Sequence, residues 1–225
     1  MIVTIDGPAG SGKSSTARAV AERLGFRHLD SGAFYRALTW AVLDAGIPPA
    51  DWATLRPEQL DTLHVRGESA RPGYRLFAGE RDITDLIRSD LVNAHVSAIA
   101  ALPAVRGWLL ARLRQAGRGG NLVADGRDMG TVVFPNAELK FFLVADAAIR
   151  AYRRLLERGE DPATPGLLPS EVARIQARDL ADSTRAVAPL RRADDAVEID
   201  TTSLSFEQQV NTIVQRVSAF RPARH

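Results

Sequence analysis

Short apolar runs alternate with amphipathic stretches along most of this chain of 225 residues. A buried parallel strand is typically a continuous apolar run, whereas a covering helix carries apolar residues three and four positions apart. The pattern predicts strands at residues 2–5, 26–30, 122–125, 139–144 and 196–200. It predicts helices around residues 17–24 and at 31–46, 89–101, 103–116, 146–158, 170–184 and 205–220. This alternation indicates an α/β fold, with a five-stranded parallel sheet and helices on both of its faces.

Several predicted helix ends carry the residues that start or stop helices. Ser205 and Gln208 have the spacing of a capping box. Gly25 and Gly46 each follow an apolar helical stripe, where a glycine commonly ends a helix. Ser31 lies near the predicted N-cap of its helix.

The pattern changes between about residues 46 and 90. A short helix bounded by prolines is followed by three short strand-like runs, at residues 63–67, 74–79 and 81–84, with a turn at 71–73 between the first two. We expect a small antiparallel β insert here. The chain would then be a single domain over residues 1–225, with a core at 1–45 and 90–225.

The composition is that of an ordinary soluble globular protein, with 45% hydrophobic and 25% charged residues. No apolar run approaches the length of a membrane span, and the start MIVTIDGP lacks the features of a signal peptide. Cysteine is absent, which excludes disulfides and thiolate metal sites and fits a reducing compartment. The formal net charge is only +2, which argues against a global attraction to nucleic acid. We expect a cytoplasmic monomer with neither a membrane nor a nucleic acid among its partners.

The strongest motif begins directly after the first predicted strand. Residues 7–14 fit the pattern G-x-x-x-x-G-K-[ST], the P-loop, and an amphipathic helix follows them. In such a loop, backbone N–H groups and a helix N-terminus converge on phosphates, a lysine reaches the β- and γ-phosphates, and a serine hydroxyl binds Mg²⁺. The loop therefore predicts ATP with Mg²⁺ held by Ser14, in a site formed by Gly7, Pro8, Ala9, Gly10, Ser11, Gly12, Lys13, Ser14 and Ser15.

Lysine is rare in this chain, which makes its place in the motif informative. Of 29 basic residues only Lys13 and Lys140 are lysines. A compact ammonium suits a tight anion-binding loop better than a broad, planar guanidinium does.

A P-loop alone leaves three classes open. A GTPase would carry an Asn-Lys-x-Asp motif, which is absent, and a transporter-type or helicase-type ATPase would show a strand ending in Asp-Glu, where this chain has LVADGRD. A small-molecule kinase needs a second, arginine-rich pocket for an anionic acceptor. The chain has arginines in suitable clusters, so a kinase is the favoured class.

The candidate acceptor residues follow predicted strands, at the edge of the sheet where ligands bind in open α/β folds. Ser31, Tyr35 and Arg36 follow the second strand, although Tyr35 would serve equally well in the core. Asp125, Arg127 and Asp128 follow the third strand and also suit a structural ion-pair cluster.

Two further groups of charged residues lie on predicted helices. Arg178, Asp182 and Arg185 share one helical face, which suits either a ligand or a solvated salt-bridged surface. Arginines at positions 150, 153, 154 and 158 flank a Gly/Pro-rich loop, as in a lid that closes over phosphates.

Together these segments resemble the bacterial cytidylate kinase family, nucleoside monophosphate kinases with a P-loop kinase fold. The resemblance rests on TIDGPAGSGKS, LDSGAFYRAL, VADGRDMGTVVFP and RAVAPL, which span residues 4 to 190. It implies a monophosphate-binding role for the insert and a lid at about residues 153–168. It implies contacts to CMP from Ser31, Tyr35, Arg36, Ser97, Arg106, Arg127, Asp128, Arg178, Asp182 and Arg185.

The resemblance also implies the reaction, in which ATP phosphorylates CMP or dCMP to the diphosphate. The catalytic residues would be Lys13, Arg36, Arg127, Arg153 and Arg154, the last two from the lid. Within the cytosine pocket, Asp128 would read the amino group, and Arg106 and Arg185 the ring nitrogen and carbonyl. The alternatives are a P-loop kinase acting on UMP, AMP or a non-nucleotide acceptor, and a nucleotide-gated nucleic-acid-binding protein. Against the latter, aromatic residues make up only 6% of the chain.

Overall fold

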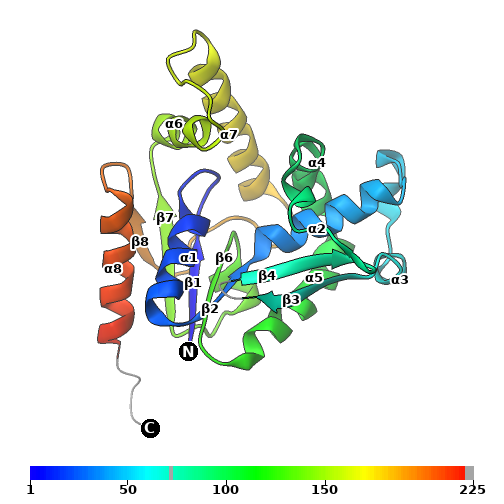
Figure 1. The fold of residues 1–225 in the computed structure, drawn as a ribbon, viewed down its shortest axis with the longest axis horizontal. Helices are drawn as coiled ribbons and strands as arrows, with labels where there is room; N and C mark the ends of the chain where they lie inside the picture. Colours follow the sequence, from blue (N-terminus) through cyan, green and yellow to red (C-terminus); the bar gives the residue numbers. More distant parts are fainter. Residues whose placement is uncertain (71–72, 221–225) are drawn as a thin grey trace.

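A parallel sheet of five strands forms the centre of the protein, which we describe from a computed structural model over residues 1–70 and 73–220 (Figure 1). In sheet order the strands are β2 (Arg27–Asp30), β6 (Leu122–Gly126), β1 (Ile2–Asp6), β7 (Leu139–Val144) and β8 (Val197–Asp200). Neighbouring strands pair in parallel, with Val3 of β1 opposite Val123 of β6 and Leu139 of β7. The predicted fold class is confirmed.

Helices cover both faces of this sheet, as the alternating pattern predicted. The covering helices are α1 (Lys13–Leu24), α2 (Ser31–Asp44), α4 (Asp90–Ala101), α5 (Pro103–Ala116) and α8 (Phe206–Ala219). Two more helices, α6 (Ala147–Glu157) and α7 (Leu167–Thr184), lie beyond one edge of the sheet (Figure 1). Apolar residues of α1 and α8 form one core with β1, β7 and β8, and those of α2, α4 and α5 form a second core on the other face. The central strands β1 and β6 are therefore buried on both faces, whereas Glu198 and Asp200 of the edge strand β8 are exposed.

Helix ends follow the predicted signals with two differences. Ser205 and Gln208 form the capping box of α8, and Gly25 ends α1 in the left-handed conformation. The N-cap of α2 is Asp30, whose carboxylate accepts from Ala33 N, because the Ser31 hydroxyl donates to a backbone oxygen of β6 instead. Helix α7 begins at Leu167, three residues before the predicted start.

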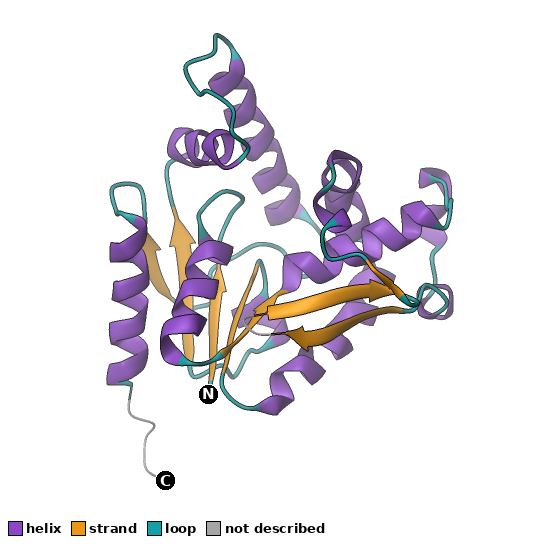
Figure 2. Cartoon of the chain, viewed as in Figure 1, coloured by secondary structure: helices purple, strands orange, loops and turns teal. Residues whose placement is uncertain are grey.

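The insert folds as a three-stranded antiparallel sheet beside α2 (Figure 2). Its strands are β3 (Val65–Ala70), β4 (Gly73–Ala78) and β5 (Arg81–Asp82). The helix predicted before them is two short pieces, a 3₁₀ helix at Pro49–Thr54 and α3 at Pro57–Asp61, because Pro57 starts a new helix. The turn predicted at 71–73 includes Arg71 and Pro72, which lie outside the described residues.

The carboxyl ends of the five strands meet at one edge of the sheet, where the P-loop follows β1 (Figure 1). Helices α6 and α7 pack against each other beyond this edge and form an arm, and α4 lies across from them. The fold therefore gathers all the predicted ligand-binding segments on one side.

A buried carboxylate ties β1 to the loop after β6. Asp6 is 4% exposed, and its two oxygens accept hydrogen bonds from Met129 N (2.9 Å) and Gly130 N (2.8 Å). Burial raises the pKa of Asp6 to about 7, against the opposing effect of these two N–H groups. The loop that begins at Arg127 is thus held by a carboxyl group that titrates near neutral pH.

Among the described residues, no single helix has the length and hydropathy of a membrane span. Taken together, the bent pair Asp90–Ala101 and Pro103–Gly119 meets that test by length and composition only.

The insert packs closely against α2 at Gly67, which makes this glycine a test of the fold. A Cβ on Gly67 would meet ring atoms of Phe34 at 2.5 and 2.7 Å, and Phe34 is buried. We expect Gly67→Ala to lower the free energy of unfolding by about 1–3 kcal/mol, as overpacking does. Gly107→Ala is the matched control, because a Cβ there meets nothing within 4 Å and alanine favours the helix interior. Equal denaturant midpoints for the two variants would contradict this packing.

Asp6 gives the stability a specific pH dependence. Its folded pKa of about 7 exceeds its unfolded value, so the folded state holds one extra proton between about pH 4 and 7. The free energy of unfolding therefore falls as pH rises through this window, by up to about 1.4 kcal/mol per pH unit from this group.

Asp6→Asn should remove that slope while lowering stability at every pH, because an amide cannot accept from both N–H groups. Urea unfolding between pH 5 and 8 measures the difference, with the exposed Asp194→Asn as control. Parallel curves for wild type and Asp6→Asn would show that Asp6 is already ionised at pH 5.

Candidate active site

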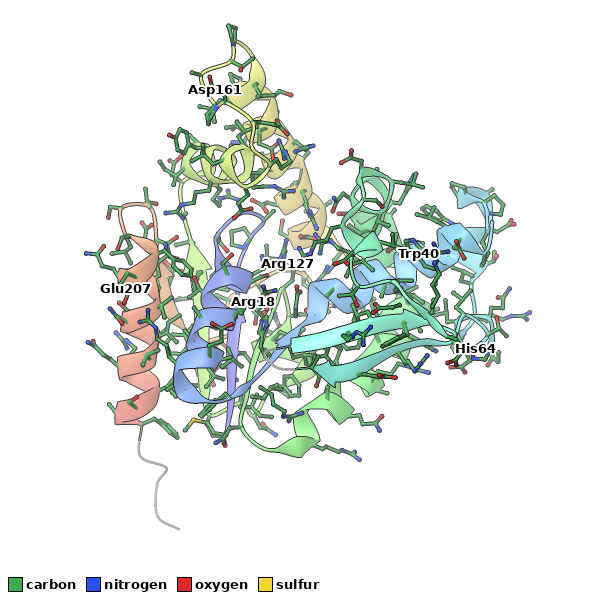
Figure 3. The ribbon with its side chains drawn as sticks, in the orientation of Figure 1. Arg18, Trp40, His64, Arg127, Asp161 and Glu207 are labelled. Carbon is green, nitrogen blue, oxygen red and sulfur yellow. The ribbon has the colours of Figure 1, made fainter. Side chains whose placement is uncertain are left out.

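The carboxyl edge of the sheet opens into a cavity of 800 Å³, walled by the P-loop, the loop after β6, and helices α1, α2, α4, α5, α6 and α7. Most of the predicted site residues line it: Ala9, Gly10, Gly12, Lys13, Ser14, Ser15, Tyr35, Arg36, Ser97, Arg106, Arg127, Asp128, Arg154, Arg178, Asp182 and Arg185. Figure 3 labels Arg127 near the centre of the view, close to the lower end of α7. Residues far apart in the sequence thus meet in one hollow.

The P-loop presents a buried ammonium and a helix N-terminus to this cavity. Gly12 is the N-cap of α1 with φ 80°, a left-handed conformation that glycine adopts at little cost. Lys13 is 7% exposed, and its Nζ donates to Pro8 O at 3.1 Å. Burial, and then the positive charge of Arg127, lower the pKa of Lys13 well below its ordinary value. An anion bound here would therefore strongly stabilise the charged form of Lys13.

A hydroxyl and a carboxylate lie side by side below the P-loop. Ser14 Oγ donates to Asp125 Oδ2 at 2.5 Å, and His28 Nε2 lies 2.7 Å from Asp125 Oδ1. Burial alone would raise the pKa of Asp125, but the interactions with His28 and Ser14 outweigh it and keep the pKa below its ordinary value. Both Ser14 and Asp125 line the cavity. Such hard oxygen donors fit Mg²⁺, which keeps several waters and takes few protein ligands.

Five arginines that line the cavity are close enough to repel one another: Arg36, Arg88, Arg127, Arg154 and Arg178. Burial, followed by the charges of Arg127 and Arg36, lowers the pKa of Arg178 to about 9. The pKa of Arg36 is also lowered by burial, and Arg88, Arg127 and Arg154 lower it further. Two carboxylates oppose them: Asp30, which acts on Arg36 and pairs with Arg88, and Asp182, which accepts from Arg127 Nε at 2.8 Å. Positive charge exceeds negative charge at this point.

A second polar cluster lies at the acceptor end. Asp128 is 3% exposed; it forms a hydrogen-bonded ion pair with Arg106 and lies 3.7 Å from Arg185 Nη2. The Arg106 guanidinium lies 5.3 Å from the centroid of the Tyr35 ring. Arg185 is fixed by a hydrogen bond from its Nε to Ala188 O at 2.7 Å. One carboxylate and two guanidiniums thus face a common space with fixed geometry.

Three of these arginines keep buried donor atoms that have no hydrogen-bond partner among the described residues. The atoms are Arg106 Nε, Arg178 Nε and Arg185 Nη2. Leaving such donors unpaired is costly, and buried polar groups in folded proteins nearly always find partners. Since all three residues line the cavity, a ligand rich in hydrogen-bond acceptors would satisfy them.

Some predicted site residues lie outside the cavity lining. Gly7, Pro8 and Ser11 belong to the P-loop but do not line the cavity. Ser31 does not line it either, and its Oγ donates to Asp125 O at 2.8 Å. Arg153 donates to Thr201 O at 2.6 Å and to Thr201 Oγ1, while its neighbour Arg154 lines the cavity. Of the two arginines predicted for the lid, the structure therefore brings only Arg154 to the site.

The sequence pattern assigned no specific role to several residues at the site. It placed Asp125 at the ligand edge only, and the signal for its contact with Ser14 is its place at the end of the strand beside β1. Arg18, labelled in Figure 3, and Arg88 also line the cavity. Asp179 contacts the P-loop from α7, a contact that no local pattern indicates.

Comparison with known proteins shows the family to which the sequence is related. The cytidylate kinase family model matches residues 3–219. A cytidylate kinase of Azotobacter vinelandii is 45% identical over 224 residues, covering 97% of this chain and 96% of the relative. That of Halalkalibacterium halodurans is 42% identical over 214 residues, covering 95% and 96%.

Other relatives are longer or more distant. A bifunctional pantoate ligase/cytidylate kinase of Synechococcus elongatus is 47% identical over 219 residues; the match covers 95% of this chain but spans only 41% of that relative's length. A solved structure of an uncharacterized protein from Eubacterium ventriosum aligns over 98% of this chain and 99% of its own, with a TM-score of 0.50 and 11% identity, which speaks to the fold alone.

The family model spans nearly the whole chain, and the full-length relatives share more than two fifths of their aligned residues with it. The chain belongs to the cytidylate kinase family.

Proposed function

We propose that this chain transfers the γ-phosphoryl group of ATP to CMP or dCMP, giving ADP and CDP or dCDP. The observation that carries the proposal is the unbalanced positive charge of the cavity. Lys13, Arg36 and Arg178 all have lowered pKa values there, and Arg106, Arg178 and Arg185 keep unpaired buried donors. Two phosphate-bearing ligands would supply both the missing charge and the missing acceptors.

The donor end of the proposed reaction is the P-loop. Lys13 leaves its contact with Pro8 O to hold the β- and γ-phosphates of ATP, and the N-terminus of α1 adds its positive end. Mg²⁺, where bound, would be held by Ser14 and Asp125 and would neutralise charge on the transferring phosphoryl group. The two residues are already in contact, so the site needs little rearrangement.

The acceptor end uses the arginines around Asp182. Arg36 and Arg127 hold the phosphate of CMP, while Arg178 and Asp182 lie where the ribose would be. The acceptor phosphate oxygen is already anionic, so the reaction needs no general base. Positioning the two phosphates and screening their repulsion supply the rate enhancement.

The proposed base pocket of Asp128, Arg106 and Arg185 would favour cytosine over uracil. Asp128 accepts a hydrogen bond from the cytosine amino group, and Arg106 and Arg185 donate to its ring nitrogen and carbonyl. Uracil places an acceptor where Asp128 needs a donor, so a buried carboxylate would face a carbonyl.

We further propose the division into a core, an insert at about residues 46–90 and a lid at about 153–168. Antiparallel strands within the first range and the α6–α7 arm across the second support it. A monomeric state, a cytoplasmic location and the absence of a nucleic acid partner stay predictions.

The proposal is tested by ADP release across the nucleoside monophosphates. We expect CMP and dCMP to be the best acceptors for the wild type, and Lys13→Ala to lower kcat by about 100-fold or more while CMP affinity changes little. The control is Lys140→Met at the only other lysine, which pairs with Asp195 outside the cavity and should retain turnover. Faster turnover of AMP or UMP by the wild type, or normal turnover by Lys13→Ala, would overturn the assignment.

Asp128→Asn tests the reading of the base. We expect kcat/KM for CMP to fall by about 10- to 100-fold, the value of one hydrogen bond to a charged group. The amide can donate to the carbonyl of uracil, so the ratio of CMP to UMP activity should fall further still. Thermal melting checks that the fold survives the loss of the pair with Arg106. An unchanged ratio among CMP, UMP and AMP would remove Asp128 from the base pocket.

A further inference from the structure

The third residue of the P-loop, Ala9, is bound to the rest of the protein through both its backbone N–H and its backbone carbonyl. Ala9 N donates to Asp179 Oδ1 at 3.0 Å, and Ala9 O accepts from Arg150 Nη1 at 2.8 Å. Both backbone groups of Ala9 are therefore occupied before any nucleotide arrives. The loop is attached at this point to helices that come 140 and more residues later in the chain.

The two side chains that hold Ala9 are themselves joined. Arg150 Nη1 lies 2.5 Å from Asp179 Oδ2, and Arg150 Nε donates to Ala145 O at 2.9 Å. Arg150 is 7% exposed, and a Cβ on Gly10 would lie 3.1 Å from its Cβ, so the P-loop and α6 are in close contact. We call Ala9, Arg150 and Asp179 the loop clamp. A largely buried, charged and hydrogen-bonded cluster of this kind holds its members in fixed positions.

The loop clamp stands beside residues that face the acceptor. On α7, Arg178 precedes Asp179 and Asp182 follows it by three positions, and both line the cavity. On α6, Arg154 follows Arg150 by one helical turn and also lines it. Any displacement of α7 toward a ligand at Arg178 must therefore move, strain or break the contact with Ala9.

We propose that Asp179 is a positioning residue that couples the donor loop to the acceptor-binding helix, so that CMP and ATP bind cooperatively. The inference rests on the proposed function. Asp179 does not line the cavity, and it reaches the donor site only through its hydrogen bond from Ala9 N. It acts by fixing the position of Ala9, and with it the neighbouring amides of Gly10 and Gly12, relative to Arg178. Because the clamp is already formed, a displacement of α7 by one nucleotide is transmitted to the P-loop, and the other nucleotide then binds to a site that is shifted toward its bound arrangement.

Coupling between two sites is reciprocal and is measured as a ratio of affinities. The probes are CMP and a non-hydrolysable ATP analogue with Mg²⁺, titrated calorimetrically alone and together. We expect the wild type to bind CMP about fivefold tighter or better when the analogue is present. In Asp179→Asn that factor should fall to about one, because the pair with Arg150 is lost while the amide keeps the size of the side chain.

Turnover separates positioning from simple loss of structure. Asp179→Asn should lower kcat by about tenfold or more, because the two phosphates are bound but misaligned. Each KM, measured with the other substrate saturating, should rise only by the lost coupling factor of about five. The matched control is Glu207→Gln, which removes the carboxylate of the exposed ion pair between Arg23 of α1 and Glu207 of α8. Figure 3 labels Glu207 on α8, away from α6 and α7. This control should keep both the coupling factor and kcat.

A measurement on the wild type alone keeps the inference falsifiable if Asp179→Asn fails to fold. CMP added without ATP should shift the amide ¹H–¹⁵N resonance of Ala9, although Ala9 lies on the donor side. An unmoved Ala9 resonance at saturating CMP, a coupling factor near one in the wild type, or equal coupling factors in wild type and Asp179→Asn would each overturn the inference. Absence of CMP binding by the wild type would instead contradict the proposed function, and the inference with it.

Discussion

Mutual repulsion among buried cations is the constraint on which the rest of this structure depends. Lys13 and Arg178 have pKa values pushed down by burial and by Arg127, and Arg36 is affected in the same way. Buried charges normally find partners or lose their charge. Here the guanidiniums stay charged because their ordinary pKa is so high, so the fold must hold them together against repulsion until an anion arrives.

Carboxylates placed by the fold meet this constraint only in part. Parallel strands end at a common edge, which brings Asp125 of β6 next to the helix that follows β1. Helix α7 contributes Asp179 to the P-loop and Asp182 to Arg127. These acidic residues fix the positions of the cations without neutralising them all, so the cavity is ordered and positively charged at once. Such preorganised charge needs no rearrangement during a phosphoryl transfer.

The sequence alone predicts those features whose physics is local. The P-loop, the strands and the capping box of α8 follow from residues close together in the chain, and all three form. The order β2-β6-β1-β7-β8 depends on tertiary packing, so the pattern could not give it. The splitting of the insert helix has a local signal, Pro57 at the start of α3, which the prediction of a single helix passed over. Ser97 and Arg106 were expected at the site only by resemblance, because nothing in their surroundings in sequence marks them. Arg153 was expected beside Arg154, but successive residues of a helix point in different directions, and Arg153 holds Thr201 instead.

The excess of positive charge continues into the α6–α7 arm and gives it an electrostatic reason to move. Glu171 is 3% exposed and contacts three guanidiniums, those of Arg154, Arg158 and Arg174. Glu171 thus faces three cations, of which Arg158 is shared with Glu160 and Arg154 also lines the main cavity. Phosphates in that cavity compete with Glu171 for Arg154 and carry more negative charge than it does. Under the proposed function, this competition would draw Arg154, and the arm that carries it, toward the nucleotides and exclude water from their phosphates.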